Sequence, residues 1–402
     1  MCEKKYNCGK GIALIIILVL ITAIVVIGLG FIIRGDTELL CGQNMELKAD
    51  MDYLTESGLE HARGLILNPQ DVTTDYWTGD TEQQLVSGSS DYYDVAVNFN
   101  ELYPFNYQIT SLAYRENGGQ RTAQSSLTAE LRLNPCIVYW QSDNQDIPSE
   151  VNITGDAYFE NSVTNHGRID GDVYSAGTVG GTPPIRGQRY QNVSQAPCNM
   201  PGISYSDFSS QYYYNGLGPY LVKLVLSGTY DGTTFPEPGA DPGRVYYCGD
   251  DLVIDGNVFV NGTLVVKNDL RLKAGNLTIQ SAKNFPALII GHDLLIEEPD
   301  DPNDPNDPNA PNDPNNRSSM LTATGYTQIG RHIDMNDKTG SSIKVNGALY
   351  VFGDGIVDTT GCTVDISGMP HKACLAIWSS GENLTRWSPA AGAFYKSIVR
   401  NP

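Results

Sequence analysis

An apolar run near the start of the chain is the strongest pattern in this sequence. Residues 11–33 contain no charged side chain and consist mainly of Ile, Leu and Val. About 20 such helical residues cross the hydrocarbon core of a bilayer. We therefore predict a transmembrane anchor that includes Ile12, Leu20 and Ile33. A cleaved secretory signal would be shorter and end in a small-residue cleavage site before Arg34, and a buried core helix would show a polar face.

The basic residues beside this run predict its orientation. Lys4, Lys5 and Lys10 precede it, and only Arg34 follows closely. Because positively charged flanks stay in the cytoplasm, the N-terminus is expected inside. The prediction is a single-pass protein of the cytoplasmic (inner) membrane whose C-terminal part is periplasmic or extracellular.

The helical pattern continues beyond the membrane. Apolar residues fall mostly three, four or seven positions apart, with charged residues between them, which is one stripe on a helix: Leu40, Leu47, Met51, Leu54, Ala62 and Leu65. Asn68 and Pro69 predict its end, because proline cannot donate to the helical ladder. A continuous helix over residues 12–67 would be roughly 80 Å long.

Residues 69–148 predict a small β module. The stretch 105–114 alternates in part, Glu116-Asn117-Gly118-Gly119 is a turn signal, and residues 123–133 run back. This pattern predicts a hairpin that packs on the exposed half of the long helix.

A six-residue repeat dominates the second half of the chain. Pairs of apolar residues two apart recur every six positions, with Asp255-Gly256 and Asn261-Gly262 at the corners. The clearest pairs are Leu252/Ile254, Val258/Val260, Leu264/Val266 and Leu270/Leu272. A weaker step of six links Val151, Ala157, Val163 and Ile169. Short strands joined by tight corners produce this spacing, so residues 150–180 and 248–370 predict one interrupted parallel β-helix. An antiparallel sandwich is the alternative.

Three further segments complete the predicted organisation. Residues 181–247 are rich in Gly, Pro and Tyr and predict a long loop or lid over the solenoid. Residues 300–316 repeat Asp-Pro-Asn and contain no apolar side chain larger than those of alanine and proline, which predicts an extended loop. That loop is interpreted as a solvated spacer, with loose calcium binding by its aspartates as the alternative. Residues 371–402 predict C-terminal strands.

The N-terminal residues resemble a known family. Lys10-Gly11 precedes Ile12-Ala13-Leu14-Ile15-Ile16, and the amphipathic part carries Leu54-Thr55-Glu56-Ser57-Gly58-Leu59-Glu60-His61-Ala62. Over about residues 4–67 the chain resembles PilX-type minor pilins and the K-type minor pseudopilin of general secretion. The later six-residue repeats are similar to the β-helix of bactofilins.

This resemblance implies a cleavage site and a set of partners. A prepilin peptidase would cut after Gly11 of the leader, residues 1–11, and leave Ile12 as the first residue. Major pilins carry a glutamate at the fifth mature position, where this chain has Ile16. The implied role is therefore a minor subunit whose partners are the membrane, other pilin-like helices and the pilus assembly machinery.

Charge narrows the choice of partners. Only Glu3, Lys4, Lys5, Lys10 and Arg34 of the charged residues lie at or before position 34, which leaves 45 acidic and 22 basic side chains beyond it. A surface this acidic disfavours nucleic acid and anionic lipid headgroups.

Six cysteines lie beyond the membrane, in an oxidising compartment. Connectivity cannot be derived from sequence. The favoured disulfides are Cys362 with Cys374 and Cys198 with Cys248, and free buried thiols are the alternative.

Candidate catalytic chemistry is sparse. The five histidines form no helical metal pair, and neither a nucleophile elbow nor a P-loop occurs. Asp250, Asp251 and Asp269 could serve a polysaccharide lyase or hydrolase, and His292 could be the base of an acyltransferase, but aspartate beside glycine is ordinary turn chemistry. We expect no enzyme activity, no cofactor and no metal site.

The sequence therefore predicts an α+β protein with a minor pilin or pseudopilin role in a type IV pilus or type II secretion assembly, displaying a β-helical head. A fixed membrane-anchored scaffold or glycan-binding surface protein is the second interpretation. An enzyme acting on envelope polysaccharide is the third.

Overall fold

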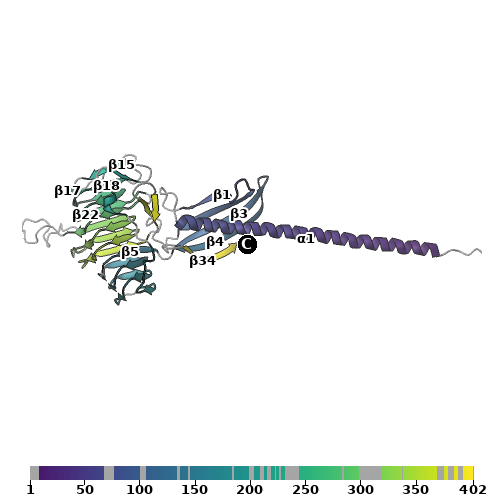
Figure 1. The fold of residues 1–402 in the computed structure, drawn as a ribbon, viewed down its shortest axis with the longest axis horizontal. Helices are drawn as coiled ribbons and strands as arrows, with labels where there is room; N and C mark the ends of the chain where they lie inside the picture. The colour runs from purple at the N-terminus through teal and green to yellow at the C-terminus, as the bar shows by residue number, and fades with distance from the viewer. Residues whose placement is uncertain are drawn as a thin grey trace, which may run out of the picture.

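The computed structural model describes residues 9–67, 77–99, 106–133, 136–143, 145–182, 185–198, 203–208, 212–214, 219–221, 223–225, 228–230, 244–282, 285–297, 318–336, 338–368, 375–378, 384–387 and 393–401. They form a long helix, an antiparallel sheet on one half of that helix, and a parallel β-solenoid beyond the helix end (Figure 1). The predicted fold class, a long N-terminal helix with a hairpin module and a β-helical head, is confirmed.

Helix α1 spans Gly9–Leu67, 59 residues, which makes it about 90 Å long. It contains no proline, so nothing in its sequence breaks the hydrogen-bond ladder. Half of the helix projects free of the rest of the molecule, and the other half lies along the antiparallel sheet (Figure 1).

The antiparallel sheet has the order β1-β2-β3-β4-β34. Its strands are β1 (Gly79–Gln83), β2 (Asp91–Phe99), β3 (Asn106–Asn117), β4 (Gln120–Leu133) and β34 (Ala393–Asn401). Gly118 and Gly119, with φ of 59° and 79°, make the two-residue turn between β3 and β4. Both positions need positive φ in this kind of hairpin, which explains the glycine pair.

The last strand comes from the far end of the chain. β34 pairs with β4, and Ala393 lies opposite Leu133. The chain therefore leaves the sheet at Leu133, builds the solenoid, and returns beside the point where it left. Within the predicted C-terminal strands, β32 (Leu375–Trp378) and β33 (Leu384–Trp387) form a separate hairpin.

The solenoid has three faces, each a ladder of parallel strands. The first face is called the strap face, after a segment described below that covers it from outside. Among the described residues it is a ten-stranded sheet, in the order β13 (Arg189–Tyr190), β11 (Val173–Ser175), β8 (Asp156–Phe159), β5 (Ile137–Gln141), β29 (Leu349–Val351), β26 (Thr327–Ile329), β23 (Leu288–Ile290), β21 (Thr263–Val266), β18 (Val245–Cys248) and β16 (Lys223–Val225).

The polar face is the second ladder. It consists of β20 (Val258–Asn261), the end of β22 (Leu270–Gln280), β25 (Ser319–Thr324), β28 (Ser342–Asn346), β31 (Thr363–Ser367), β7 (Val151–Thr154) and β10 (Arg168–Asp170). Its strands pair in parallel along the whole ladder.

The interrupted face is the third. One ladder holds β17 (Gly228–Tyr230), β19 (Leu252–Asp255), the start of β22, β24 (Leu294–Ile296), β27 (His332–Asp334) and β30 (Gly355–Val357). A separate ladder holds β6 (Gln145–Ile147), β9 (Val163–Asn165) and β12 (Val179–Gly180). Between β30 and β6 the pairing stops, whereas β29 pairs with β5 and β31 with β7 on the other two faces.

The strand order shows that the chain enters the solenoid in its middle. From β5 it coils outward through β8 and β11 to one end, then resumes at the opposite end with β16 and coils back until β29 docks on β5. Both segments advance in the same direction along the axis, as an all-parallel ladder requires. The parallel pairing of the described strands excludes the antiparallel sandwich for this part.

β5 and β6 correct the predicted boundary of the β module. Both lie inside residues 69–148, yet they pair with β8, β9 and β29 of the solenoid. The sequence could not reveal this, because β5 is buried on both faces and shows no alternation of apolar and polar residues.

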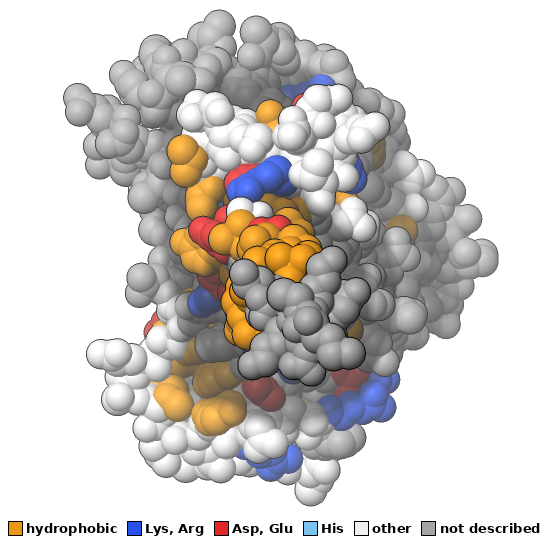
Figure 2. Space-filling view, turned by 90° about the vertical axis from the view of Figure 1, so that its right-hand side faces the viewer, with side chains coloured by type: hydrophobic (Ala, Val, Ile, Leu, Met, Phe, Trp, Pro, Cys, Tyr) orange, Lys and Arg blue, Asp and Glu red, His pale blue; other side chains and the backbone are white. Residues whose placement is uncertain are grey.

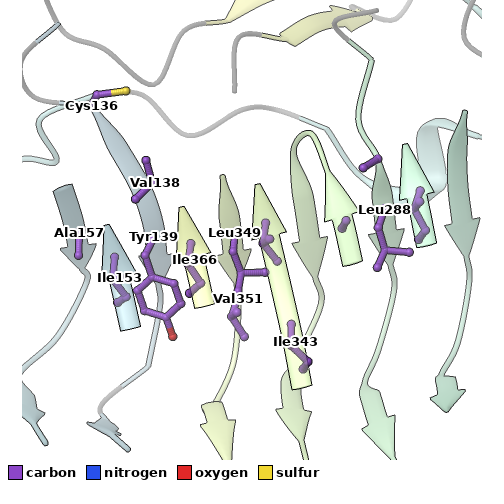
Figure 3. Packing of buried hydrophobic residues seen from close by; sticks show 14 of the residues in the cluster. Cys136, Val138, Tyr139, Ile153, Ala157, Leu288, Ile343, Leu349, Val351 and Ile366 are labelled. Atoms are coloured by element: carbon purple, nitrogen blue, oxygen red, sulfur yellow. The ribbon is translucent and has the colours of Figure 1, made fainter. Parts of the chain in front are cut away.

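The apolar repeat fills the inside of the coils. Leu252, Ile254, Val258 and Val260 have at most 2% of their surface exposed. Figure 3 shows Ile153 and Ile366 on neighbouring strands, Ile343 on the next strand of the same sheet, and Tyr139 and Leu349 on the facing sheet. Each coil buries its row only by stacking on the next coil.

A strap covers the strap face from outside; we use this name for residues 191–208, of which 199–202 lie outside the described residues. The backbone N–H of Val193 donates to Ser175 O near the β13 end of the strap face, and Tyr205 lies against Gly291 much further along the sheet. Cys198, Ile203 and Phe208 are at most 9% exposed in a cluster with Trp140, Tyr158, Tyr350 and Ile289. This described part of the predicted lid therefore lies flat on the solenoid.

Candidate functional site: the apolar helix and the carboxylate corner

The projecting half of α1 is the largest apolar surface of the described protein. From Leu14 to Ile33 the Ile, Leu, Val and Phe side chains are 53–72% exposed, including Leu20 and Ile33 of the predicted anchor. Figure 2 looks toward this end of the helix and shows its orange side chains in front of the head. Full burial of one such side chain is worth about 1.5–3 kcal/mol, so this segment requires lipid or other helices around it.

This helix is long and apolar enough to span a membrane, and it is the one such helix among the described residues. Gly11 and Ile12, the residues of the predicted cleavage site, lie within α1, although residues 1–8 of the leader are outside the described part. Ile16, where a major pilin carries glutamate, is 57% exposed.

The second half of α1 packs on the antiparallel sheet. Met51, Leu54, Leu59, Ala62 and Ile66 are at most 5% exposed. They join the strand residues Val95, Ile109, Ala129 and Leu131 in one core. Of the predicted amphipathic stripe, Met51, Leu54 and Ala62 are buried, whereas Leu40 is 59% exposed. Leu59 and Ile66, which the predicted stripe did not include, complete the face that packs on β2, β3 and β4.

Two small residues within residues 54–62, Thr55 and Gly58, determine how closely α1 packs on the sheet. A Cβ on Gly58 would lie 2.3 Å from Ser111 Oγ and 3.1 Å from the Tyr93 ring. Thr55 is fully buried, and its Oγ1 donates to Met51 O and lies 3.3 Å from Ser125 O. The motif therefore allows the backbone of α1 to approach the sheet.

Ion pairs tie the sheet to the exposed side of the helix. Arg400 on β34 contacts Asp52 and Glu56 of α1. Arg115 on β3 donates to Asp91 at 2.5 Å and reaches Asp50 at 3.5 Å. These pairs are partly exposed, so each contributes at most about 1 kcal/mol. Their main effect is to fix where the last strand lies against the helix.

The predicted disulfide between Cys198 and Cys248 is absent from the structure. Both cysteines are buried and form no disulfide, Cys198 in the strap and Cys248 inside the coil. Burial raises the pKa of Cys198 to about 12. Cys374 lies outside the described residues, so its predicted pairing with Cys362 stays a prediction.

The candidate carboxylates meet at one corner of the solenoid, between the strap face and the interrupted face. Asp251, Asp269 and Asp293 occupy equivalent positions in successive coils, each just before an inward leucine. Each carboxylate accepts the backbone N–H of the next coil: Asp269 N to Asp251 at 3.2 Å, Asp293 N to Asp269 at 3.3 Å, and His332 N to Asp293 at 3.3 Å.

Neighbouring side chains occupy the remaining oxygens. Arg271 lies 3.3 Å from Asp269 and 2.6 Å from Glu297, and Asn268 donates to Asp250 at 2.9 Å. His292 lies 3.9 Å from Asp269. The corner is therefore a ladder of carboxylates that satisfy backbone amides, as expected of aspartates at turns. Among the described residues, no group of His, Cys, Asp and Glu is arranged to hold a metal.

The structure contains a second carboxylate ladder, which the sequence analysis did not predict. Asp156 accepts from Cys136 N and from Asp172 N, both at 2.8 Å, and Asp172 accepts from Gln188 N. Burial raises the pKa of Asp156. The signal that could have found this ladder is the step of sixteen residues that relates Gly155-Asp156, Gly171-Asp172 and Gly187-Gln188.

A buried lysine was also missed. Lys338, 2% exposed, donates from Nζ to the carbonyls of Lys273 and Glu297 and to Ser319 Oγ. Glu297 and Ser319 flank the Asp-Pro-Asn segment, which itself lies outside the described residues. Lys338 thus holds together the two ends from which that segment departs.

Comparisons with known proteins add little to this geometry. No family model matches the sequence, and no curated protein matches it. Among solved structures, the chain is similar to the competence-associated pilin ComZ from Thermus thermophilus, with 10% identity, 88% of this chain and 97% of that chain covered, and a TM-score of 0.23. A score this low does not establish a common overall arrangement.

Proposed function

We propose that this chain is a minor pilin-like or pseudopilin-like subunit that enters a fibre of a type IV pilus or type II secretion system through α1 and displays the solenoid at its tip. The observation that carries the proposal is the division of α1. One half is an exposed apolar rod, and the other half is the floor of a complete antiparallel sheet.

The exposed half supports storage in a membrane followed by assembly. An apolar helix is stable in lipid, and it can leave lipid only when other helices replace the lost contacts. Beyond the apolar run, Leu39, Leu40 and Met45 remain 59–69% exposed. A neighbouring helix that covered residues 14–33 would cover these side chains as well, whereas a bilayer crossed by residues 14–33 would leave them in water.

The fifth-position residue and the head support a minor role. Ile16 lacks the carboxylate that the pilin resemblance associates with repeated packing. The solenoid is inserted between β4 and β34, so the sheet on the helix is complete without it. A bulky head on a complete base suits a subunit that starts or caps a fibre.

Cleavage of the leader tests this proposal. Intact-mass measurement and N-terminal sequencing of the membrane-extracted protein are expected to find Ile12, with or without methylation, as the first residue. Gly11→Val is expected to abolish processing, since a prepilin peptidase cuts after that glycine. Gly9→Val, two residues away, is the matched control and should leave processing intact.

The runner-up interpretations make different predictions. A fixed membrane-anchored scaffold would keep its leader and remain in the membrane fraction when surface fibres are sheared off. An envelope-polysaccharide enzyme would lose activity in Asp250→Asn and Asp251→Asn variants. We propose that the chain is not an enzyme, because the carboxylates of the corner already accept backbone and side-chain hydrogen bonds.

A further inference from the structure

The polar face carries two straight columns of outward side chains. The first runs through Phe259, Thr278, Thr322, Lys344, Asp365, Asn152 and Arg168, and the second through Asn261, Gln280, Thr324, Asn346, Ser367, Thr154 and Asp170. Neighbouring members are one strand spacing apart, about 4.8 Å, so the columns extend for about 29 Å. Hydroxyl and amide side chains make up three of the seven members of the first column and six of the seven members of the second.

These side chains are available to a ligand. Thr278, Thr322, Thr324 and Asn346 are half-buried and Gln280 is exposed, while the residues between them point into the core. None of these five side chains has a hydrogen-bond partner within the part of the chain that the structure describes. The strap, in contrast, covers much of the strap face.

The charge of the polar face differs from that of the whole molecule. Along the two columns, Lys344 and Arg168 are balanced by Asp365 and Asp170. The chain as a whole has a formal net charge of −20. A polyanion is repelled by the acidic molecule, and a polycation would find more acid elsewhere. A neutral polymer rich in hydroxyl groups matches this surface.

We propose that the polar face binds a neutral polysaccharide laid along the solenoid axis. Sugar hydroxyls would exchange hydrogen bonds with the threonine, asparagine and glutamine side chains, which repeat at the strand spacing. Phe259, 38% exposed at one end of the first column, would stack on the apolar face of a sugar ring. The inference deepens the proposed function by naming a target for the displayed head, and it rests on that function only for display.

Binding to insoluble neutral glycans tests the proposal. Full-length protein in detergent is sedimented with cellulose and with chitin, and double-stranded DNA and an acidic polysaccharide serve as polyanion probes. We expect the wild type to sediment with at least one neutral glycan and with neither polyanion. Thr278→Glu combined with Thr322→Glu should weaken that binding at least about tenfold, which corresponds to about 1.4 kcal/mol.

A matched double variant separates the face from general charge. Thr164→Glu with Thr229→Glu adds the same two charges on outward positions of β9 and β17, on the interrupted face. It should bind like the wild type. Absence of binding to both neutral glycans, preference for a polyanion, or equal weakening in the two double variants would each overturn the proposal. None of these outcomes depends on cleavage or assembly, so a failed leader-processing test is distinguishable from a failed binding test.

Discussion

Backbone approach limits the choice of residue at one corner of the solenoid. Where the polar face turns into the strap face, glycines of successive coils stack on one another. A Cβ on Gly171 would lie 2.0 Å from Gly155 O, and one on Gly347 would lie 2.3 Å from Gly325 O. Gly347 also has φ of 152°, which side chains disfavour. At these positions the coil spacing itself demands glycine.

Gly171→Ala is therefore expected to destabilise the head. The added methyl group meets a backbone carbonyl that cannot rotate away, and overpacking of this kind costs about 1–3 kcal/mol. Thermal unfolding followed by circular dichroism measures the loss. Gly64→Ala, on an open part of α1 with nothing within 4 Å of the new methyl group, is the control and should gain up to about 1 kcal/mol through helix propensity. Equal melting of Gly171→Ala and the wild type would contradict the stacking argument.

Most individual elements could be predicted from the sequence, whereas their order in space could not. The helix, the Gly118-Gly119 turn and the six-residue repeat leave strong local periodicities, and the inward pairs from Leu252 onward are buried as predicted. The docking of β29 on β5 joins residues about 200 positions apart, and no local pattern encodes it. For the candidate site, spacing indicated the corner aspartates but not the backbone amides that they accept.

The packing of the strap on the strap face can be tested through the reactivity of the Cys198 thiol. Because burial raises the pKa of Cys198 to about 12, its thiol is far less ionised at pH 8 than that of an ordinary exposed cysteine. We expect iodoacetamide at pH 8 to label the exposed Cys41 in the folded protein and to label Cys198 only after denaturation. Mass spectrometry of tryptic peptides gives the readout. Failure of Cys198 and Cys248 to label in denaturant without reductant would instead reveal a disulfide between them.

At the scale of the whole molecule, the protein is a helix-and-sheet base with a solenoid inserted between two paired strands. Leu133 and Ala393 lie opposite each other in the β4–β34 ladder, so the insertion begins and ends at the same point. The buried side chains of the base, on α1 and the antiparallel sheet, and those of the coils belong to one contiguous cluster. Among the described residues, no strand of the antiparallel sheet pairs with a strand of the solenoid, so the two parts share no backbone ladder.

Replacing residues 134–392 with Asn-Gly is expected to yield a folded base. Asn-Gly forms the two-residue turn that joins directly opposite antiparallel residues. The shortened chain should keep the helix and the five-stranded sheet, as judged by circular dichroism and cooperative unfolding, and should lose glycan binding. Replacement with Pro-Pro, which cannot make this turn, is the control. A molten product with the Asn-Gly turn would show that the base needs the head to fold.

Attachment at the middle coil has a consequence for how this head can diversify. New coils inserted just before the strap lengthen one end of the solenoid, and new coils inserted just after it lengthen the other, while β5 and β29 keep their places above the helix. The length of the solenoid can thus change in either direction without moving its attachment to the base. Only the segment between β13 and β16, which includes the strap, has to grow in step, since it connects the two ends.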